Sequence, residues 1–311
     1  MRKVLVIGAG GFIGSALVEY LYKHGCFIYA VGRSPGLLRE RRMLNLKGVS
    51  FYPIELPDDS LRELLITVKF DTIVYSAGTS SVGNSVMRPY EDYLSSVDPL
   101  AYVMEEIRQC SPESHFIFLS SAAVYGNQTT SPISETAPLK PISAYGFHKK
   151  ICELLLEEYS DLYGLHTTAL RIFSAYGPFL RKQVVYDLCT KIVSPGTSLE
   201  ILGTGNESRD FIHLDDICRA IELVASRRQE GVFNLASGVE TSIVELALLL
   251  GEILGIQKTI CYTGSENKGN PVKWRADISR LGELGFTISK PIQEGLVEYC
   301  TWFKSQEWSI N

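Results

Sequence analysis

The sequence lacks the features that mark several large classes of protein. No stretch of its 311 residues reaches the roughly 18 consecutive apolar residues expected of a membrane-spanning helix. Acidic residues outnumber basic ones, and the net charge is −5 at pH 7. This charge gives no reason to expect nucleic acid as a partner. Seven scattered cysteines show no C-x-x-C spacing, and five histidines show no motif such as H-E-x-x-H. These absences predict a cytoplasmic protein with reduced thiols, no metal site and no membrane partner.

A tyrosine and a lysine form the most informative pattern that is present. Tyr145 and Lys149 stand four residues apart, so on a helix they project from one face. The ammonium of Lys149 then favours the ionised form of the Tyr145 phenol, and a phenolate is a usable base near neutral pH. Ser121 lies upstream in a serine-rich segment. Tyr125 is a poorer candidate for the base, because no lysine follows it at the same spacing.

The first residues predict a dinucleotide site. Residues 4–7 are wholly apolar and lead into glycines at 8, 10, 11 and 14, with apolar residues at 13, 17 and 21 on one helical face. This order predicts a strand, a glycine turn and a helix. Glycines let the backbone approach a pyrophosphate, whose charge is met by the amides and dipole at the helix start. Such a turn also serves as a plain connection, but the downstream tyrosine and lysine favour the binding role.

Strand-like and helix-like segments alternate along the chain. Strands are expected at 4–7, 26–31, 49–56, 72–77, 115–120, 167–173 and 232–236, with helical patterns in most gaps. This alternation predicts an α/β fold, a Rossmann-type doubly wound parallel sheet with a smaller C-terminal lobe. Residues 1–173 are assigned to the dinucleotide-binding domain, to which 211–236 returns, and 174–311 to the substrate-binding lobe. The last seventy residues are expected to form helices and loops.

Six motifs follow one another over nearly the whole chain. They are Gly8-x-x-Gly11-x-x-Gly14, the Ser-Ser-Ala-Ala-Val-Tyr-Gly of 120–126, Tyr145-x-x-x-Lys149, 170–173 with 176–178, the Arg-Asp-Phe-Ile-His-Leu-Asp-Asp of 209–216, and 276–277. In this order they resemble the extended short-chain dehydrogenases/reductases of the NAD(P)-dependent nucleotide-sugar epimerase/dehydratase family. The resemblance implies a nicotinamide dinucleotide, a nucleoside-diphosphate sugar and hydride exchange at a sugar carbon, usually C4.

The resemblance also implies roles for particular residues. Tyr145 would be the acid/base, Lys149 would hold the nicotinamide ribose, and Ser121 would hydrogen-bond the reacting oxygen. The predicted cofactor contacts, besides Tyr145 and Lys149, are Gly8, Gly11, Phe12, Ile13, Gly14, Arg33, Ser34, Glu55, Leu56, Ala77, Gly78 and Phe173. The predicted substrate contacts are Thr79, Ser121, Ser174, Arg209, Lys273 and Arg275.

Arg209 is the preferred ligand of the nucleotide diphosphate, because a guanidinium grips phosphate through two hydrogen bonds. The alternative is an ion pair of Arg209 with Asp210 or Asp215. Of Lys273 and Arg275, one is expected to bind phosphate.

Departures from the family pattern reduce the number of reactions that are expected of this chain. Ala122 and Ala123 follow the catalytic serine, where 4,6-dehydratases carry an Asp-Glu pair that removes water from the sugar. Methyl groups transfer no protons, so dehydration is not expected. Ala122 also replaces the cysteine found in the epimerase-reductases that make GDP-fucose.

The expected second strand ends without the acidic residue that binds the adenosine ribose in NAD-specific members. Arg33 and Ser34 stand there instead and suit a 2′-phosphate, so NADP(H) is favoured over NAD(H). An Arg33 that stacks on adenine or is merely solvated is the alternative. Because cells generally keep NADP reduced, an NADPH-dependent 4-ketoreductase of a 4-keto-6-deoxy sugar nucleotide is narrowly favoured. An NDP-sugar 4-epimerase is a close second, ahead of a non-nucleotide carbonyl reductase and a non-catalytic dinucleotide sensor.

The resemblance finally implies a homodimer. Helices expected near 90–108 and 147–163 bear apolar stripes, and in this family such helices form a four-helix dimer interface. The stripes include Val97, Ala101 and Met104 in the first and Leu154, Leu155 and Tyr159 in the second. The alternative is that these residues only pack on the sheet, which requires no dimer.

Overall fold

Seven short apolar runs form one parallel sheet, which confirms the predicted Rossmann-type α/β class. The computed structural model describes residues 2–79, 81–205, 207–264 and 272–306. The strand order is β10-β6-β5-β4-β1-β2-β3, and every neighbouring pair is parallel. The bounds are β1 Lys3–Ile7, β2 Phe27–Gly32, β3 Val49–Pro53, β4 Thr72–Tyr75, β5 His115–Ser121, β6 Thr167–Ile172 and β10 Gly231–Leu235.

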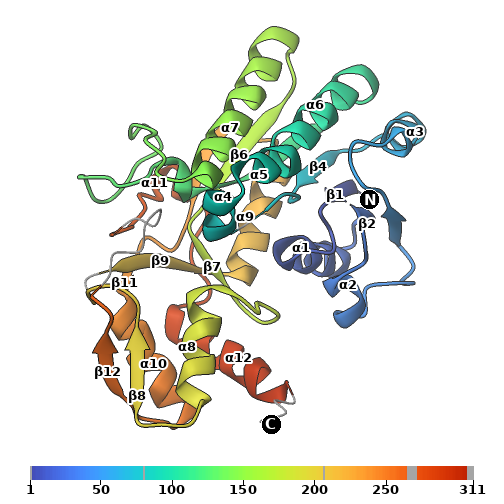
Figure 1. Cartoon of the computed structure of the whole chain (residues 1–311). Coiled ribbons are helices and arrows are strands. Elements are labelled where there is room, and N and C mark those ends of the chain that lie inside the picture. The colour runs from blue at the N-terminus through green and yellow to red at the C-terminus, as the bar shows by residue number, and fades with distance from the viewer. Residues whose placement is uncertain (1, 80, 206, 265–271, 307–311) are drawn as a thin grey trace.

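Helices cover both faces of this sheet, which is why its strands are almost continuously apolar. On one face lie α1 (Phe12–Lys23) and α9 (Leu214–Arg227), whose Leu17 and Ile221 enter a core with Val6. On the other lie α3 (Asp59–Thr67), α6 (Asp98–Cys110) and α7 (Ala144–Tyr163), seen beside the sheet in Figure 1. Among the described residues, no helix is both long and apolar enough to cross a membrane.

Short helices connect the longer elements of these layers. They are α2 (Leu37–Glu40), α4 (Val82–Met87), α5 (Pro89–Ser96), the 3₁₀ turn η1 (Ala122–Val124) and α11 (Ser279–Glu283). Two expected strands are shorter than predicted, because β3 ends at Pro53 and β4 ends at Tyr75. The chain leaves the sheet after Tyr75 and reaches Gly78 with φ of 115°, a conformation that extended strands do not adopt.

A second lobe, in the lower part of Figure 1, has its own apolar core. Its elements are β7 (Ser174–Tyr176), α8 (Gln183–Val193), β8 (Ser198–Ile201), β9 (Ser208–His213), β11 (Glu240–Ser242), α10 (Ile243–Leu254), β12 (Thr259–Tyr262) and α12 (Ile292–Ser305). The expectation of only helices and loops in the last seventy residues is therefore wrong, because they contain β12. β11 and β12 are three and four residues long, too short to show a period, and pair with the distant β9 and β8.

A buried ion pair fastens α7 to the sheet. Arg171 of β6 and Glu153 of α7 are both under a tenth exposed, and their closest nitrogen and oxygen atoms lie 2.7 Å apart. Arg171 also donates to the Tyr125 hydroxyl at 2.9 Å, and Glu153 accepts from the hydroxyl of Ser120. Because Ser120 directly precedes Ser121, this network fixes the end of β5 and α7 relative to each other.

Replacing Arg171 tests how strongly this network stabilises the fold. Arg171→Met leaves the Glu153 charge buried without its cation, so we expect the free energy of unfolding to fall by about 3–5 kcal/mol in urea denaturation. Arg108→Met is the matched control, because the Arg108–Glu105 pair is 36% exposed on each side and should be worth about 0–1 kcal/mol. Equal losses of unfolding free energy in the two variants would contradict the stabilising role assigned to the Arg171–Glu153 pair.

Candidate active site

Tyr145 and Lys149 lie on one face of the first turns of α7, as their spacing predicts. Ser143 caps the helix by accepting a hydrogen bond from the Gly146 amide at 3.2 Å. The Lys149 ammonium lies 5.9 Å from the centroid of the Tyr145 ring. It is buried and donates to the carbonyl oxygen of Leu119 at 2.8 Å. Lysine has three N–H groups, so two remain for other partners.

Ser121 is the last residue of β5 and faces the start of α7. Its hydroxyl oxygen accepts from the Ala123 amide at 3.2 Å, which leaves its own proton free to donate. A Cβ at Gly146 would lie 2.5 Å from the Ala123 carbonyl oxygen, so glycine is what allows α7 to approach η1 this closely. Tyr145 packs against the cluster that contains Ala122 and Ala123. The three predicted catalytic residues therefore surround one small region.

Tyr125 does not compete with Tyr145 as a base. It is fully buried, and its hydroxyl donates to Asn234 at 2.6 Å while accepting from Arg171. Burial raises the pKa of Tyr125 to about 12, despite the neighbouring Arg171. A phenol in this position stays protonated near neutral pH.

The glycine turn after β1 fits a pyrophosphate. Gly8 has φ of 86°, and a Cβ there would lie 2.5 Å from the Ala77 amide nitrogen. A Cβ at Gly14 would lie 2.3 Å from the Gly8 carbonyl oxygen, which shows how tightly the turn packs on α1. The N-cap Gly11 offers no side-chain hydrogen bond, and the first turn of α1 has no acidic residue. Free amides and the positive end of the helix dipole thus face this turn without a counter-charge. Phe12 and Ile13 are partly buried against the core.

The remaining predicted cofactor residues lie along the carboxyl ends of β2, β3 and β4. Arg33 and Ser34 are exposed, and an Arg33 nitrogen is 3.7 Å from a carboxylate oxygen of Glu55. Leu56 and Ala77 are partly buried against the core, and Gly78 follows them with positive φ. Register places Ile7, Val31 and Tyr75 side by side, so these strand ends meet at one edge.

Three further predicted residues, at 173, 174 and 79, follow the carboxyl ends of β6 and β4. Phe173 is buried, and its ring lies 5.8 Å from that of Trp274. Ser174 is partly buried at the start of β7. Thr79 is partly buried, and its hydroxyl donates to the carboxylate of Asp92.

Arg209 has the environment expected of an anion ligand. Its guanidinium carbon is 5.5 Å from the centre of the Trp274 ring, and Nη1 donates to the Ser208 carbonyl at 2.7 Å. Among the described residues, no carboxylate oxygen lies within 4.0 Å of it. Burial lowers the pKa of Arg209 to about 10, with Glu207 opposing the shift, so the side chain still carries its charge.

The alternative ion pair of Arg209 is not formed, because both acids have other partners. Asp210 accepts from the amides of Ser237, Gly238 and Ala276 at 2.7–3.1 Å, and burial raises its pKa to about 6. Asp215 instead lies 2.6 Å from the Lys290 ammonium.

Lys273 and Arg275 are both exposed on the segment that carries Trp274. Arg275 donates through Nε to the Gly238 carbonyl at 3.1 Å, whereas Lys273 points to no described partner. Trp274 belongs to the same buried cluster as Phe173 and Tyr145, which places this segment beside the catalytic residues. Residues 80 and 265–271, which are close in the sequence to Thr79 and Lys273, lie outside the described residues.

Two polar clusters escaped the sequence analysis. Asp92 bonds Thr79 and His148, which no motif links. Potential metal-ligand atoms of His213, Asp215 and Glu298 lie within 4.8 Å of one another, but the Lys290 ammonium contacts both carboxylates. That ammonium already supplies the positive charge that the two acids require. No signal in the sequence joins these segments, because they meet only through tertiary folding.

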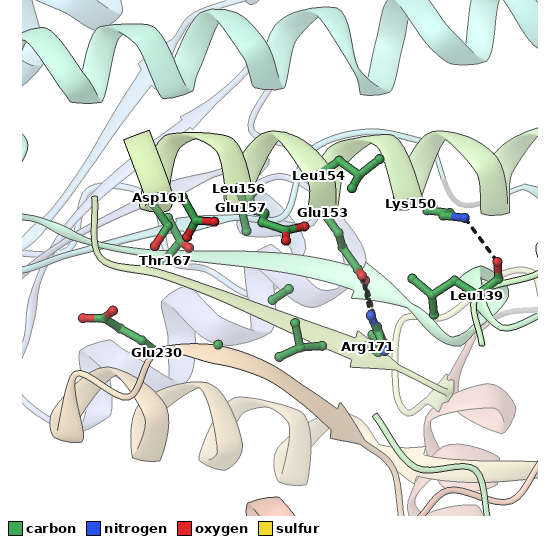
Figure 2. A pocket seen from close by; sticks show the side chains of 14 residues that line it. Leu139, Lys150, Glu153, Leu154, Leu156, Glu157, Asp161, Thr167, Arg171 and Glu230 are labelled. Atoms are coloured by element: carbon green, nitrogen blue, oxygen red, sulfur yellow. Dashed lines mark hydrogen bonds and ion pairs between the residues drawn. The ribbon is translucent and has the colours of Figure 1, made fainter. Parts of the chain in front are cut away.

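A cavity of about 500 Å³ lies between α7, β6 and β10 and is distinct from this region. Figure 2 shows Arg171 and Glu153 paired within it, and Lys150 reaching the Leu139 carbonyl nearby. None of the predicted catalytic, cofactor or substrate residues lines it.

Fold and site together define a dinucleotide-dependent enzyme of the short-chain dehydrogenase/reductase type. Residues 4–236 match the model of the "NAD dependent epimerase/dehydratase family". The chain belongs to this family, as the sequence motifs predicted. It is therefore an NAD(P)-dependent sugar-nucleotide epimerase or reductase.

Three relatives show how far the likeness extends. The chain is 27% identical to UDP-glucuronate 4-epimerase 4 of Arabidopsis thaliana, over 97% of this chain and 75% of that protein. It matches UDP-N-acetylglucosamine 4-epimerase from Methanobrevibacter ruminantium M1, in complex with UDP-N-acetylmuramic acid, at 29% identity and a TM-score of 0.89, covering 98% and 99% of the two chains. It matches MoeE5 in complex with UDP-glucose and NAD at 30% identity and a TM-score of 0.86, covering 97% and 98%.

A single methyl group at Gly14 tests the dinucleotide site. Gly14→Ala puts a Cβ 2.3 Å from the Gly8 carbonyl oxygen, so the turn must shift and the amides lose their alignment on the pyrophosphate. We expect cofactor affinity to fall about tenfold or more, because one or two charge-assisted hydrogen bonds to the pyrophosphate are lost. Dinucleotide released from the purified protein, quantified and identified by mass spectrometry, measures this. Gly282→Ala, where nothing lies within 4 Å of the added Cβ, should retain full loading.

Proposed function

We propose that the protein is a UDP-sugar 4-epimerase that recycles its bound dinucleotide. The observation that carries this proposal is that Ser121, Tyr145 and Lys149 lie where β5 and η1 meet α7, in a chain that aligns over nearly its full length with UDP-sugar-bound structures. The sequence alone had narrowly favoured a 4-ketoreductase. The relatives named above favour its stated alternative, since two are 4-epimerases of UDP-sugars.

The site supplies a proton path for this reaction. The Tyr145 phenolate takes the proton of the C4 hydroxyl and later returns it, while the Ser121 hydroxyl donates a hydrogen bond to the same oxygen. Lys149, with two N–H groups left over, holds the nicotinamide ribose, and its ammonium lies 5.9 Å from the centre of the Tyr145 ring. The bound nicotinamide supplies the chemistry of hydride removal and return at C4. Return to the opposite face inverts C4 with no net oxidation or reduction.

The proposed cofactor is NAD. Arg33, which had suggested NADP(H), is 79% exposed and has the carboxylate of Glu55 at 3.7 Å. That carboxylate partly neutralises Arg33 and would repel the two negative charges of a 2′-phosphate. The MoeE5 structure, similar over its whole length, contains NAD. In this proposal Gly8, Gly11 and Gly14 hold the pyrophosphate through backbone amides.

The proposed substrate ligand in the second lobe is Arg209, which binds the diphosphate. A half-buried guanidinium that has no carboxylate partner among the described residues gains free energy when a phosphate replaces its lost hydration. Residues up to 173 together with 211–236 would then form the dinucleotide-binding part, since α9 and β10 belong to the layers of the main sheet. The rest of 174–311 would hold the sugar nucleotide.

We also propose a homodimer through α5 and α7. Val97 and Met104 are buried against the sheet, so these two residues of the expected stripes pack within the chain itself. A different apolar stripe is solvent-exposed along α7, together with Tyr90 and Leu94 on the adjacent α5. The α7 residues are Phe147, Ile151, Leu154 and Leu162, with spacings of four, three and eight that keep them on one side of the helix. An exposed apolar stripe spanning two helices is typical of a subunit interface.

Product analysis separates the epimerase from the reductase. The purified protein is incubated with UDP-glucose, UDP-N-acetylglucosamine and UDP-glucuronate, and in parallel with NADPH and a 4-keto-6-deoxy sugar nucleotide. We expect C4 epimers to accumulate without net change in cofactor absorbance. Tyr145→Phe, which removes the acid/base, should lower kcat by about 10²–10⁴-fold. NADPH consumed in step with product would instead establish the reductase.

A charge placed on the exposed stripe tests the dimer. Leu154→Arg puts a guanidinium into the proposed interface, where its desolvation disfavours association. We expect the mass measured by light scattering to fall from two chains to one. Ile66→Arg, on an exposed residue of α3, is the control and should leave the mass unchanged. If the wild-type protein has the mass of a monomer at micromolar concentration, the proposed dimer is contradicted.

A further inference from the structure

One buried carboxylate links the loop after β4 to the catalytic helix. Asp92 of α5 is 4% exposed. One of its oxygens accepts the Thr79 hydroxyl hydrogen bond, and the other lies 2.5 Å from Nδ1 of His148. The three residues come from three different segments of the chain. In the sequence, Thr79 is 13 positions from Asp92 and His148 is 56 positions from it. Nothing in the assigned chemistry requires this contact.

His148 is part of the same helical turn as the catalytic pair. It directly precedes Lys149 and follows Tyr145 by three residues, so any rotation of this turn moves all three. Its side chain is 12% exposed, and the edge of its ring meets Tyr93 at 5.7 Å between ring centres. Among the described residues, Asp92 is the acid that pairs with it. The imidazole therefore donates its Nδ1 proton to Asp92.

Thr79 lies at the other end of this link. It follows Ala77 and Gly78, which lie at the carboxyl edge of the sheet beside the glycine turn. A buried carboxylate requires donors on both oxygens, because an unmet oxygen loses its hydration without replacement. Asp92 thus has both donors only when the Thr79 loop and the His148 turn are in place together.

We infer that Asp92 is a positioning residue that couples the Thr79 loop to the helical turn that bears Tyr145 and Lys149. Thr79 is a predicted substrate contact, and through Asp92 its position is linked to His148, which lies in the same helical turn as the predicted acid/base. The inference rests on the proposed function for the identity of the sugar. The coupling itself is a property of the fold and is measurable without turnover.

Variants that remove one donor at a time test the coupling. Thr79→Val and His148→Leu each leave one Asp92 oxygen unmet, and each should lower kcat/KM about tenfold through lost charge-assisted hydrogen bonds. Thr79→Ser keeps the hydroxyl, and His148→Asn keeps a donor near the position of Nδ1, so both should recover most of the lost efficiency. The double variant Thr79→Val/His148→Leu should lose little more than the worse single variant, because both act through one carboxylate.

A readout independent of activity is amide hydrogen exchange in the peptide that contains Thr79. His148→Leu should raise exchange there severalfold, although residue 148 lies on another element, and His148→Asn should restore the protection. Unchanged exchange, or strictly additive kinetic losses, would overturn the inference and leave the contact merely structural. A wild-type protein that converts no UDP-sugar but shows the exchange effect would refute the proposed function and keep the coupling.

Discussion

The burial of one ammonium group constrains the whole site. Lys149 is 6% exposed, donates to the Leu119 carbonyl at 2.8 Å and lies 4.6 Å from the centre of the Phe118 ring. Among the described residues, no carboxylate oxygen lies within 4.0 Å of it. A dipole and an electron-rich ring offset part of the cost of desolvating such a cation. The positive charge of Lys149 is therefore not neutralised by a described carboxylate, and it remains available to interact with the Tyr145 phenol and with a ligand.

Two further contacts fix the helix that carries this lysine. Gly146 allows the start of α7 to touch η1, and Glu153, one turn beyond Lys149, pairs with Arg171 of β6. Contacts at 146, 149 and 153 determine both the distance and the rotation of α7 against the sheet. The catalytic geometry is therefore a consequence of helix packing, and Asp92 adds a constraint from the loop after β4.

An epimerase and a reductase can share this machinery, because both require the proton exchange that is proposed for Tyr145 and a hydride exchange at C4. They differ in the source of the hydride, because an epimerase returns to C4 the hydride that it removed, whereas a reductase delivers to a keto sugar a hydride from NADPH. The missing acid at the end of β2 favoured NADP and hence reduction. The structure weakens that argument by bringing Glu55 beside Arg33, and the relatives favour epimerisation.

The sequence by itself determined the sheet, the glycine turn and the pairing of Tyr145 with Lys149. These features depend on local periodicity, on backbone conformation and on spacing within one helix, all of which are determined by residues that are close in the sequence. Only the tertiary structure decided that β11 and β12 are strands, that Arg209 has no acid partner in the described part of the chain and that Asp92 joins Thr79 to His148. Those features depend on which side chains from distant segments share a buried volume, and no local pattern encodes that choice.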